Sequence, residues 1–218
     1  MALWEDLGEE HSRRFITPGS LTHEVVRAFW HMRASTRRLL LGGVREGHIL
    51  FLLLLSDFAF FLSWSIQAII VPQSQGAGTP LQITGLYVLA FVGRTAAMYV
   101  LAMFLGAFCR SVLGGQGDWS ETRAAVFWGA LVAAPFGIVA AIASICVSFL
   151  SLPYPIFSMP WIQYAPYWIG TIPFLWFIAA GVAEVHGFRR TAPVFMCLWL
   201  PVVVGLSLAS LLHLAGIV

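Results

Sequence analysis

Two ionisable residues, Asp57 and Arg94, stand inside long apolar stretches of this sequence. A charged side chain is costly in hydrocarbon, so such residues pair with one another or line a path for an ion, proton or substrate. Asp57 precedes the end of its stretch by 14 residues (71 − 57), and Arg94 follows the start of the next by 11 (94 − 83). These depths are about 21 Å and about 16 Å, so antiparallel helices would bring the two side chains within about one turn. The sequence predicts an Asp57–Arg94 ion pair, either a clamp that fixes helix register or a polar site for an ion, a proton or an anionic substrate.

Glu184 and His186 form a second candidate pair, and Arg189 and Arg190 follow them. The Glu-x-His spacing does not place both side chains on one helical face. No third ligand lies nearby in the sequence, so we predict no metal site. We expect the two residues to mark the membrane boundary and to hydrogen-bond neighbouring helix ends. An intramembrane enzyme would need a polar cleft that joins them to other groups.

Glycines gather before an expected helix start, where Gly114, Gly115 and Gly117 precede Asp118. Asp118 fits an N-cap, and Glu121 completes a capping-box pattern. Helix N-termini attract anions, but no Lys-Ser/Thr pair follows these glycines as it does in a phosphate-binding loop. Asp118 would also place negative charge at that point. We therefore predict a flexible turn, and neither a cofactor nor a catalytic constellation is expected in this chain.

The elements that must position these residues are membrane helices. Of the 218 residues, 59% are apolar and only 10% are charged, whereas soluble chains carry about 25% charged residues. A run of about 20 apolar residues can cross the hydrocarbon core of a bilayer. The sequence therefore predicts an all-α polytopic membrane protein, whose domain 49–217 has five spans at 49–71, 83–105, 124–150, 167–185 and 194–217.

The distribution of arginine predicts the orientation of these spans. The chain has twelve arginines and no lysine, and eleven of the arginines lie in residues 1–48, 106–123 and 186–193. The connections 72–82 and 151–166 carry no charge. Because positive residues stay on the cytoplasmic side of short loops, we predict a cytoplasmic N-terminus and, after five spans, a C-terminus on the other side.

Two segments precede the first span. Residues 1–19 are expected to form a mobile cytoplasmic arm, and residues 20–45 an amphipathic helix in the membrane interface. Its apolar face would carry Val25, Phe29, Met32, Thr36, Leu39 and Leu40. Its basic residues would contact anionic lipid or a partner, or simply anchor the orientation of the first span; these are Arg27, Arg33, Arg37 and Arg38.

The connection 151–166 differs from the others because it holds four prolines together with two tyrosines and a tryptophan. The prolines predict that it is not a regular helix. Its aromatic rings are typical of the membrane interface. We interpret it as a loop on the outer membrane surface, with a re-entrant segment as the alternative.

Two stretches together resemble the bacterial branch of the Yip1 family. One contains Gly114, Gly115 and Trp119, and the other runs Glu184-Val185-His186-Gly187-Phe188. The resemblance implies a helical membrane bundle with a cytoplasmic N-terminus. Eukaryotic members engage Rab GTPases, but the Asp-Leu-Tyr-Gly-Pro-like motif of their cytoplasmic region is absent here. A chain with arginine and no lysine suggests a GC-rich bacterial genome, so that role is not carried over.

These observations predict a non-enzymatic scaffold or accessory subunit in the bacterial inner membrane. The expected partners are membrane lipids and other membrane proteins or further copies of the chain, and not nucleic acid. The alternative is a small transporter or channel that uses Asp57, Arg94 and Gln67 as a polar path. Such a transporter should show several polar residues around one cavity that is open to water.

Overall fold

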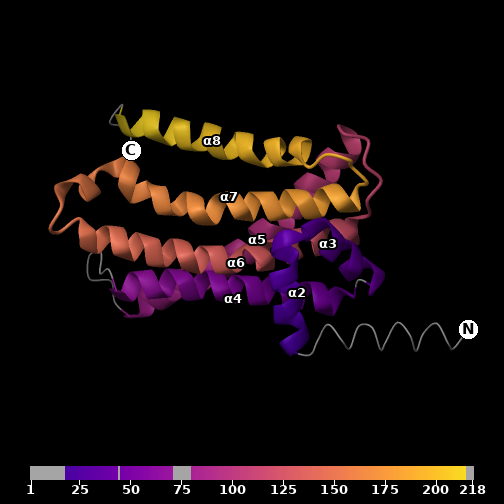
Figure 1. The fold of residues 1–218 in the computed structure, drawn as a ribbon, viewed down its shortest axis with the longest axis horizontal. Coiled ribbons are helices and arrows are strands. Elements are labelled where there is room, and N and C mark those ends of the chain that lie inside the picture. Colours follow the sequence, from indigo (N-terminus) through magenta and orange to yellow (C-terminus); the bar gives the residue numbers. More distant parts are fainter. Residues whose placement is uncertain (1–17, 44, 71–79, 215–218) are drawn as a thin grey trace, which may run out of the picture.

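The computed structural model describes residues 18–43, 45–70 and 80–214, and their regular structure is entirely helical. The predicted arm at 1–19 lies almost wholly outside these residues. Figure 1 shows a bundle of long helices with shorter helices against one side. The helices are α2 (Pro18–Trp30), α3 (Met32–Leu41), α4 (Glu46–Ile70), α5 (Pro80–Ser111), α6 (Trp119–Leu150), the 3₁₀ helix η1 (Pro155–Ser158), α7 (Pro160–Val185) and α8 (Ala192–Leu214).

Four helices, α4 to α7, are long and apolar enough to cross a membrane. They coincide with four of the five predicted spans, and α8 covers most of the fifth. The connections after α5 and α7 lie with α3 at one end of the bundle, which we call the arginine end (Figure 1). The connection through η1 lies at the opposite, charge-free end.

Helix α6 is the centre of the bundle, as its many small residues predict. It shares its largest interface with α7 and its next largest with α4. The α6–α7 interface is close because a Cβ atom on Gly129 would lie only 2.9 Å from the backbone of Ile178. A larger residue at position 129 would therefore force these two helices apart.

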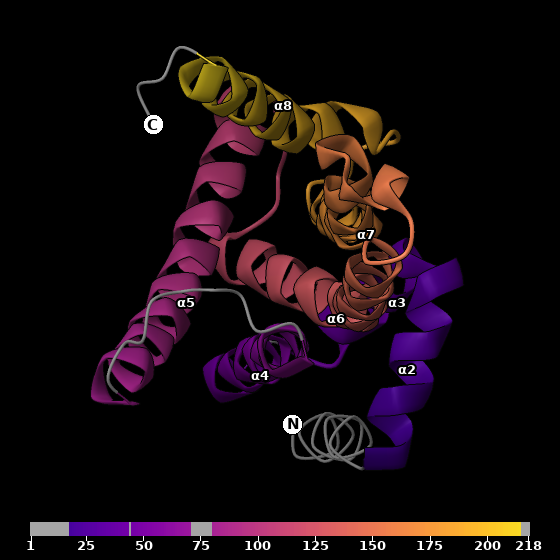
Figure 2. The same ribbon diagram turned by 90° about the vertical axis from the view of Figure 1, so that its left-hand side faces the viewer.

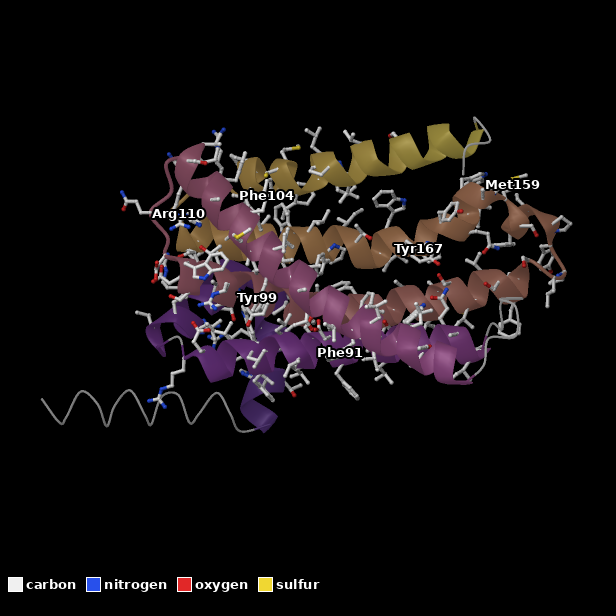
Figure 3. All side chains as sticks on the ribbon, turned by 180° about the vertical axis from the view of Figure 1, so that it is seen from behind. Phe91, Tyr99, Phe104, Arg110, Met159 and Tyr167 are labelled. Carbon is white, nitrogen blue, oxygen red and sulfur yellow. The ribbon has the colours of Figure 1, made fainter. Side chains whose placement is uncertain are left out.

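Helices α5 and α8 lie at the periphery. Figure 3 shows α5 running diagonally across the bundle. It contacts α6 near the arginine end, where the rings of Tyr99 and Phe127 are 5.0 Å apart. Helix α8 packs on α7 through rings such as Trp168 and Trp199, 5.4 Å apart. Both peripheral helices therefore have broad apolar faces turned away from the bundle.

The predicted single helix at 20–45 is in fact two helices, which meet at His31. This residue has φ −136° and ψ 53°, outside the helical region. The break lets α2 cross the bundle, where Phe29 contacts Phe136 of α6 and Phe177 of α7. Helix α3 then turns toward the arginine end. The predicted apolar face is correct, since Met32, Thr36 and Leu39 are buried and Val25, Phe29 and Leu40 are partly buried.

The prediction that 151–166 is not helical is wrong for its second half, because α7 begins at Pro160. Proline is favoured in the first turn of a helix, where its missing N–H would have no partner. Pro166 also lies inside α7, and its side chain is buried. Prolines are tolerated in membrane helices because neighbouring groups replace the lost hydrogen bond.

Candidate functional site

Asp57 and Arg94 meet in the middle of the bundle, between α4 and α5. Asp57 is completely buried, and its Oδ1 forms an ion pair with Nη1 of Arg94. The other carboxylate oxygen accepts a hydrogen bond of 2.6 Å from the hydroxyl of Thr95. Arg94 also donates to Ser56 at 3.3 Å and lies over the ring of Phe60. We call Ser56, Asp57, Arg94 and Thr95 the mid-bundle cluster.

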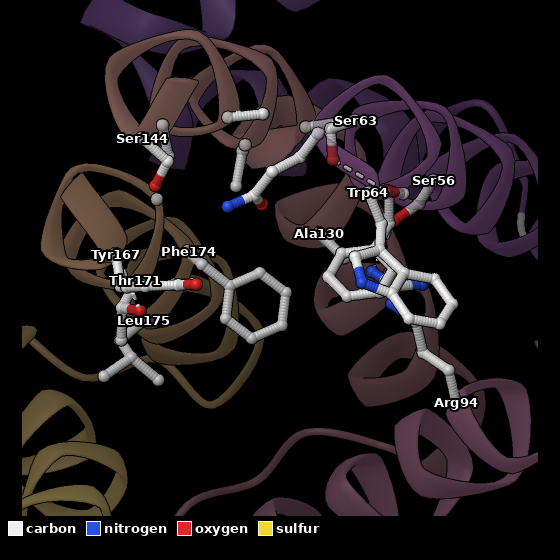
Figure 4. A pocket seen from close by; sticks show the side chains of 18 of the residues that line it. Ser56, Ser63, Trp64, Arg94, Ala130, Ser144, Tyr167, Thr171, Phe174 and Leu175 are labelled. Carbon is white, nitrogen blue, oxygen red and sulfur yellow. Dashed lines mark hydrogen bonds between the residues drawn. The ribbon is translucent and has the colours of Figure 1, made fainter. Parts of the chain in front are cut away.

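A cavity of about 480 Å³ extends from this cluster toward the charge-free end. Arg94 and Ser56 belong to its wall, whereas Asp57 does not. Figure 4 shows Ser56, Ser63 and Trp64 on one side of the cavity, facing Thr171, Phe174 and Leu175. The lining comprises Ser56, Phe60, Ser63, Trp64 and Gln67 of α4; Arg94 of α5; Ala130, Ala133, Ala134, Gly137, Ala140, Ala141 and Ser144 of α6; Tyr167, Gly170, Thr171, Phe174 and Leu175 of α7; and Val202 of α8.

A second cluster lies at the arginine end, where α3 meets the end of α7. Arg33 donates to Glu184 Oε2 at 2.8 Å, and Arg37 donates to Oε1 at 2.7 Å. The guanidinium of Arg33 also donates to the carbonyls of Phe188 and Arg189, at 2.6 and 3.0 Å. It therefore satisfies carbonyl oxygens just beyond the end of α7 and neutralises Glu184 at the same time.

His186 packs against the glycine-rich connection rather than beside Glu184. Its Nδ1 accepts a hydrogen bond of 3.2 Å from the Gly117 N–H, so this nitrogen carries no proton. Its Nε2–H then donates to the Thr122 hydroxyl at 3.1 Å, and that hydroxyl donates to the Asp118 carbonyl at 2.7 Å. Burial lowers the pKa of His186, the charge of Arg110 lowers it further, and Glu121 opposes them. The neutral imidazole is the form that this site holds.

The glycines of this connection make room for His186. A Cβ atom on Gly115 would lie 2.6 Å from the imidazole Nδ1. One on Gly117 would lie 2.4 Å from Val185 Cγ1 and 3.0 Å from a backbone oxygen. The expected flexible turn is thus a packed segment, whose glycines are needed for a close approach. Gly114 has φ +69°, a conformation that favours glycine.

The end of α7 is closed by its own glycine. Gly187 has φ +71°, and its N–H donates to the Glu184 carbonyl, while the Phe188 N–H donates to Ala183 at 2.8 Å. This is a Schellman arrangement. It turns the Phe188 ring onto the His186 ring, with centroids 5.8 Å apart. We call Arg33, Arg37, Gly115, Gly117, Thr122, Glu184, His186, Gly187 and Phe188 the α7-end cluster.

Some of the remaining basic residues bind acids of this chain, and others are exposed at the surface. Arg38 pairs with Glu24 of α2 at 2.9 Å, and Arg27 is exposed. Arg33, Arg37 and Arg38, which the sequence assigns to contact with lipid or a partner or to anchoring the first span, each also bind an acid of this chain. Nearby, Arg123 binds Glu46 of α4 and lies over the Trp119 ring. The contact of Arg33 and Arg37 with Glu184 has a signal in the sequence, because the two arginines are four residues apart and therefore lie on one face of a helix.

Among the residues that the structure describes, no group of three His, Cys, Asp or Glu side chains could hold a metal ion. Glu184 and His186 bind different partners. What the two clusters do is connect helices that are distant in sequence.

The sequence of the chain was compared with known proteins. The family model described as the Yip1 domain matches residues 21–212. This range includes both clusters and the cavity. No curated protein and no solved structure matches the chain.

Proposed function

Because this chain belongs to the Yip1 domain family, we propose that it acts as a non-enzymatic scaffold or accessory subunit of a membrane complex. One observation carries the proposal. Each acid in the described part of the chain either pairs with arginine on another helix or caps α6. The ion pairs join α2 to α3, α3 to α7, α4 to α5 and α4 to α6.

The two other described acids serve the start of α6. Asp118 is its N-cap, and Glu121 accepts a hydrogen bond from the Asp118 N–H at 3.1 Å. A proton-transfer enzyme or a proton-coupled transporter needs a titratable group that its substrate can reach and that can change its charge. The described acids are instead used to assemble helices. A protein of this kind binds other molecules through the shape and charge of its surface.

The arginine end supplies the surface for such partners. Exposed arginines remain there that form no ion pair with an acid in the described residues, namely Arg27, Arg45, Arg110, Arg189 and Arg190. Trp30 of α2 is 82% exposed beside them, and tryptophan favours the membrane interface. Anionic lipid headgroups and acidic segments of other membrane proteins fit this surface, and nucleic acid is not expected.

The same charges support an orientation and a location. Arginine-rich connections belong on the cytoplasmic side, so we place the arginine end and the N-terminus there. With α8 as the fifth span, the C-terminus lies on the opposite side. The absence of lysine favours the bacterial branch of the family and the bacterial inner membrane.

The experiment is extraction in mild detergent at native expression, followed by mass spectrometry of the proteins that co-purify. We expect a stoichiometric partner that is lost in the double variant Arg189→Gln/Arg190→Gln. The matched control is Arg189→Lys/Arg190→Lys, which keeps both charges and should keep the partner. A chain that purifies alone and moves a solute across liposomes would contradict the proposal.

A transporter or channel is the second candidate, favoured by the position of Arg94 on the cavity wall together with Ser56 and Gln67. The path is not continuous in the described residues. Beyond the cluster, toward the arginine end, Leu52, Leu53 and other side chains such as Leu105, Val126 and Phe127 are fully buried. Solute flux in liposomes, compared between wild type and Arg94→Gln, tests this candidate directly.

A further inference from the structure

The cavity between α4, α6, α7 and α8 has no role in the scaffold proposal, and its chemistry is different. We propose that it binds one hydrocarbon chain of a membrane lipid, which enters between α5 and α8. This proposal does not depend on whether the protein is a scaffold.

The dimensions of the cavity fit an elongated occupant. Its volume of about 480 Å³ is within the range of about 300–1,000 Å³ that is typical of ligand sites. Along α4 it runs from Ser56 to Gln67, which is about 16 Å at the helical rise. Its mean cross-section is therefore on the order of 30 Å², so the cavity is long and narrow, as an extended hydrocarbon chain requires.

The wall is built from small apolar side chains on one face of α6. Ala130, Ala133, Ala134, Gly137, Ala140 and Ala141 all contribute to it. They do not fill the space, and the side chains around an empty space lose dispersion contacts. Water does not fill an apolar cavity readily, so the occupant that this wall favours is hydrocarbon.

Three polar groups of the wall, on Ser63, Thr171 and Arg94, already have partners in the protein. Ser63 donates to the Phe60 carbonyl at 2.7 Å, and Thr171 donates to the Tyr167 carbonyl at 2.9 Å. Arg94 is neutralised by Asp57 and donates to Ser56. These groups do not require a polar ligand or an anion. A hydrocarbon chain can lie along them without leaving a buried donor unsatisfied.

The entrance faces lipid rather than water. Among the residues whose side chains the structure describes, α5 contributes only Arg94 to the lining and α8 only Val202. In the part of the chain that the structure describes, α5 and α8 form no substantial interface with each other. Figure 2, which looks along the bundle, shows α5 running obliquely, with one end toward α8 and the other beside α4, where it is far from α8. A lipid chain can therefore enter sideways, with its headgroup at the charge-free surface near Tyr167, which is half exposed.

The test uses the full chain in phosphatidylcholine vesicles that contain a phosphatidylcholine with a photoreactive group on one acyl chain. After illumination, labelled peptides are mapped by mass spectrometry. Gly137→Leu fills the cavity, because a Cβ atom there meets only Ser63 Oγ, at 3.8 Å. Val139→Phe is the matched control, since it also adds four carbon atoms to α6 but at an exposed position outside the lining.

In wild type we expect labels on the cavity faces of α6 and α7 as well as on the outer face of α5. Gly137→Leu should lower cavity labelling about tenfold relative to α5, a loss of about 1.4 kcal/mol of binding free energy. Val139→Phe should leave the ratio unchanged. Unchanged cavity labelling in Gly137→Leu overturns the proposal. If that variant does not fold, Ala140→Leu replaces it, and labelling of α5 at the wild-type level shows that the bundle is intact.

Discussion

The mid-bundle cluster and the α7-end cluster both neutralise a carboxylate with arginine, but in opposite surroundings. Asp57 has no exposed surface and has one arginine partner, which is 17% exposed. The Glu184 side chain is 8% exposed and has two arginine partners, which are 37% and 70% exposed. The first pair is mostly buried, while the second lies at the surface of the protein.

The difference shows what burial does to the same chemistry. Removing one partner of a buried pair leaves an unpaired charge in a medium that cannot solvate it. At the α7 end, water and the second arginine compensate for a lost contact, so each contact is worth less. The α7-end cluster joins more elements than the mid-bundle cluster does, because α3, α7 and the glycine-rich connection all meet there.

The largest effect that distinguishes the clusters should come from Asp57→Asn, which leaves Arg94 buried without its counter-charge. We expect a loss of about 3–5 kcal/mol in the free energy of unfolding. The double variant Asp57→Asn/Arg94→Gln should recover part of this loss, because no charge then remains buried. Unfolding in mixed detergent micelles, followed by tryptophan fluorescence, measures both values. If both single neutral variants are as stable as wild type, the pair is not a clamp.

The glycines of the α7-end cluster give the next largest effect, because they act through packing rather than charge. Gly117→Ala places a methyl group against Val185 and a backbone oxygen. We expect a loss of about 1–3 kcal/mol, typical of overpacking, in the same unfolding measurement. Gly93→Ala is the control, since a Cβ atom there meets nothing within 4 Å. Equal stability of the two variants would show that the connection is as flexible as the sequence suggests.

The sequence was sufficient to predict the mid-bundle contact because only two charges lie inside apolar stretches. Because one acid and one base lie at similar depth in the apolar stretches, each has only one possible partner there. The long helices followed equally directly from apolar runs of membrane length. The small residues of α6 likewise indicated a central helix.

The contacts of Glu184 could not be predicted in this way, because eleven arginines lie in segments that the sequence assigns to the same side of the membrane. Which of them reaches Glu184 depends on the direction of α3, and that direction depends on a helix break at His31. Neither proline nor glycine marks this break in the sequence. It is a product of tertiary packing, through Phe29 against α6 and α7. The start of α7 at Pro160 differs from the prediction because proline, which disrupts the interior of a helix, is favoured in its first turn.

A smaller effect is expected at Glu184 itself. Glu184→Gln removes the charge that holds Arg33 and Arg37, but both arginines keep access to water. We expect a loss of about 1 kcal/mol, which should shrink as the salt concentration rises. Thermal unfolding in detergent at low and high salt measures it, with Asp57→Asn as the comparison. A loss as large and as independent of salt as that of Asp57→Asn would remove the contrast between the clusters.

The smallest effect is a pH dependence that only the α7-end cluster should show. The pKa of His186 is lowered from 6.5 by burial and by Arg110, so the unfolded chain binds a proton more readily than the folded one. The contribution of His186 to the free energy of unfolding is therefore fully present above pH 6.5. It is lost as the pH falls from 6.5 toward the pKa of His186 in the folded state. His186→Asn keeps an acceptor for the Gly117 N–H and should remove the part of this decline that comes from His186. Glu121→Gln keeps the capping pattern but removes the charge that raises the pKa of His186, so it should enlarge the decline. Thermal unfolding between pH 7 and pH 5 measures all three proteins, and the same slope in His186→Asn as in wild type would assign the titration to another group.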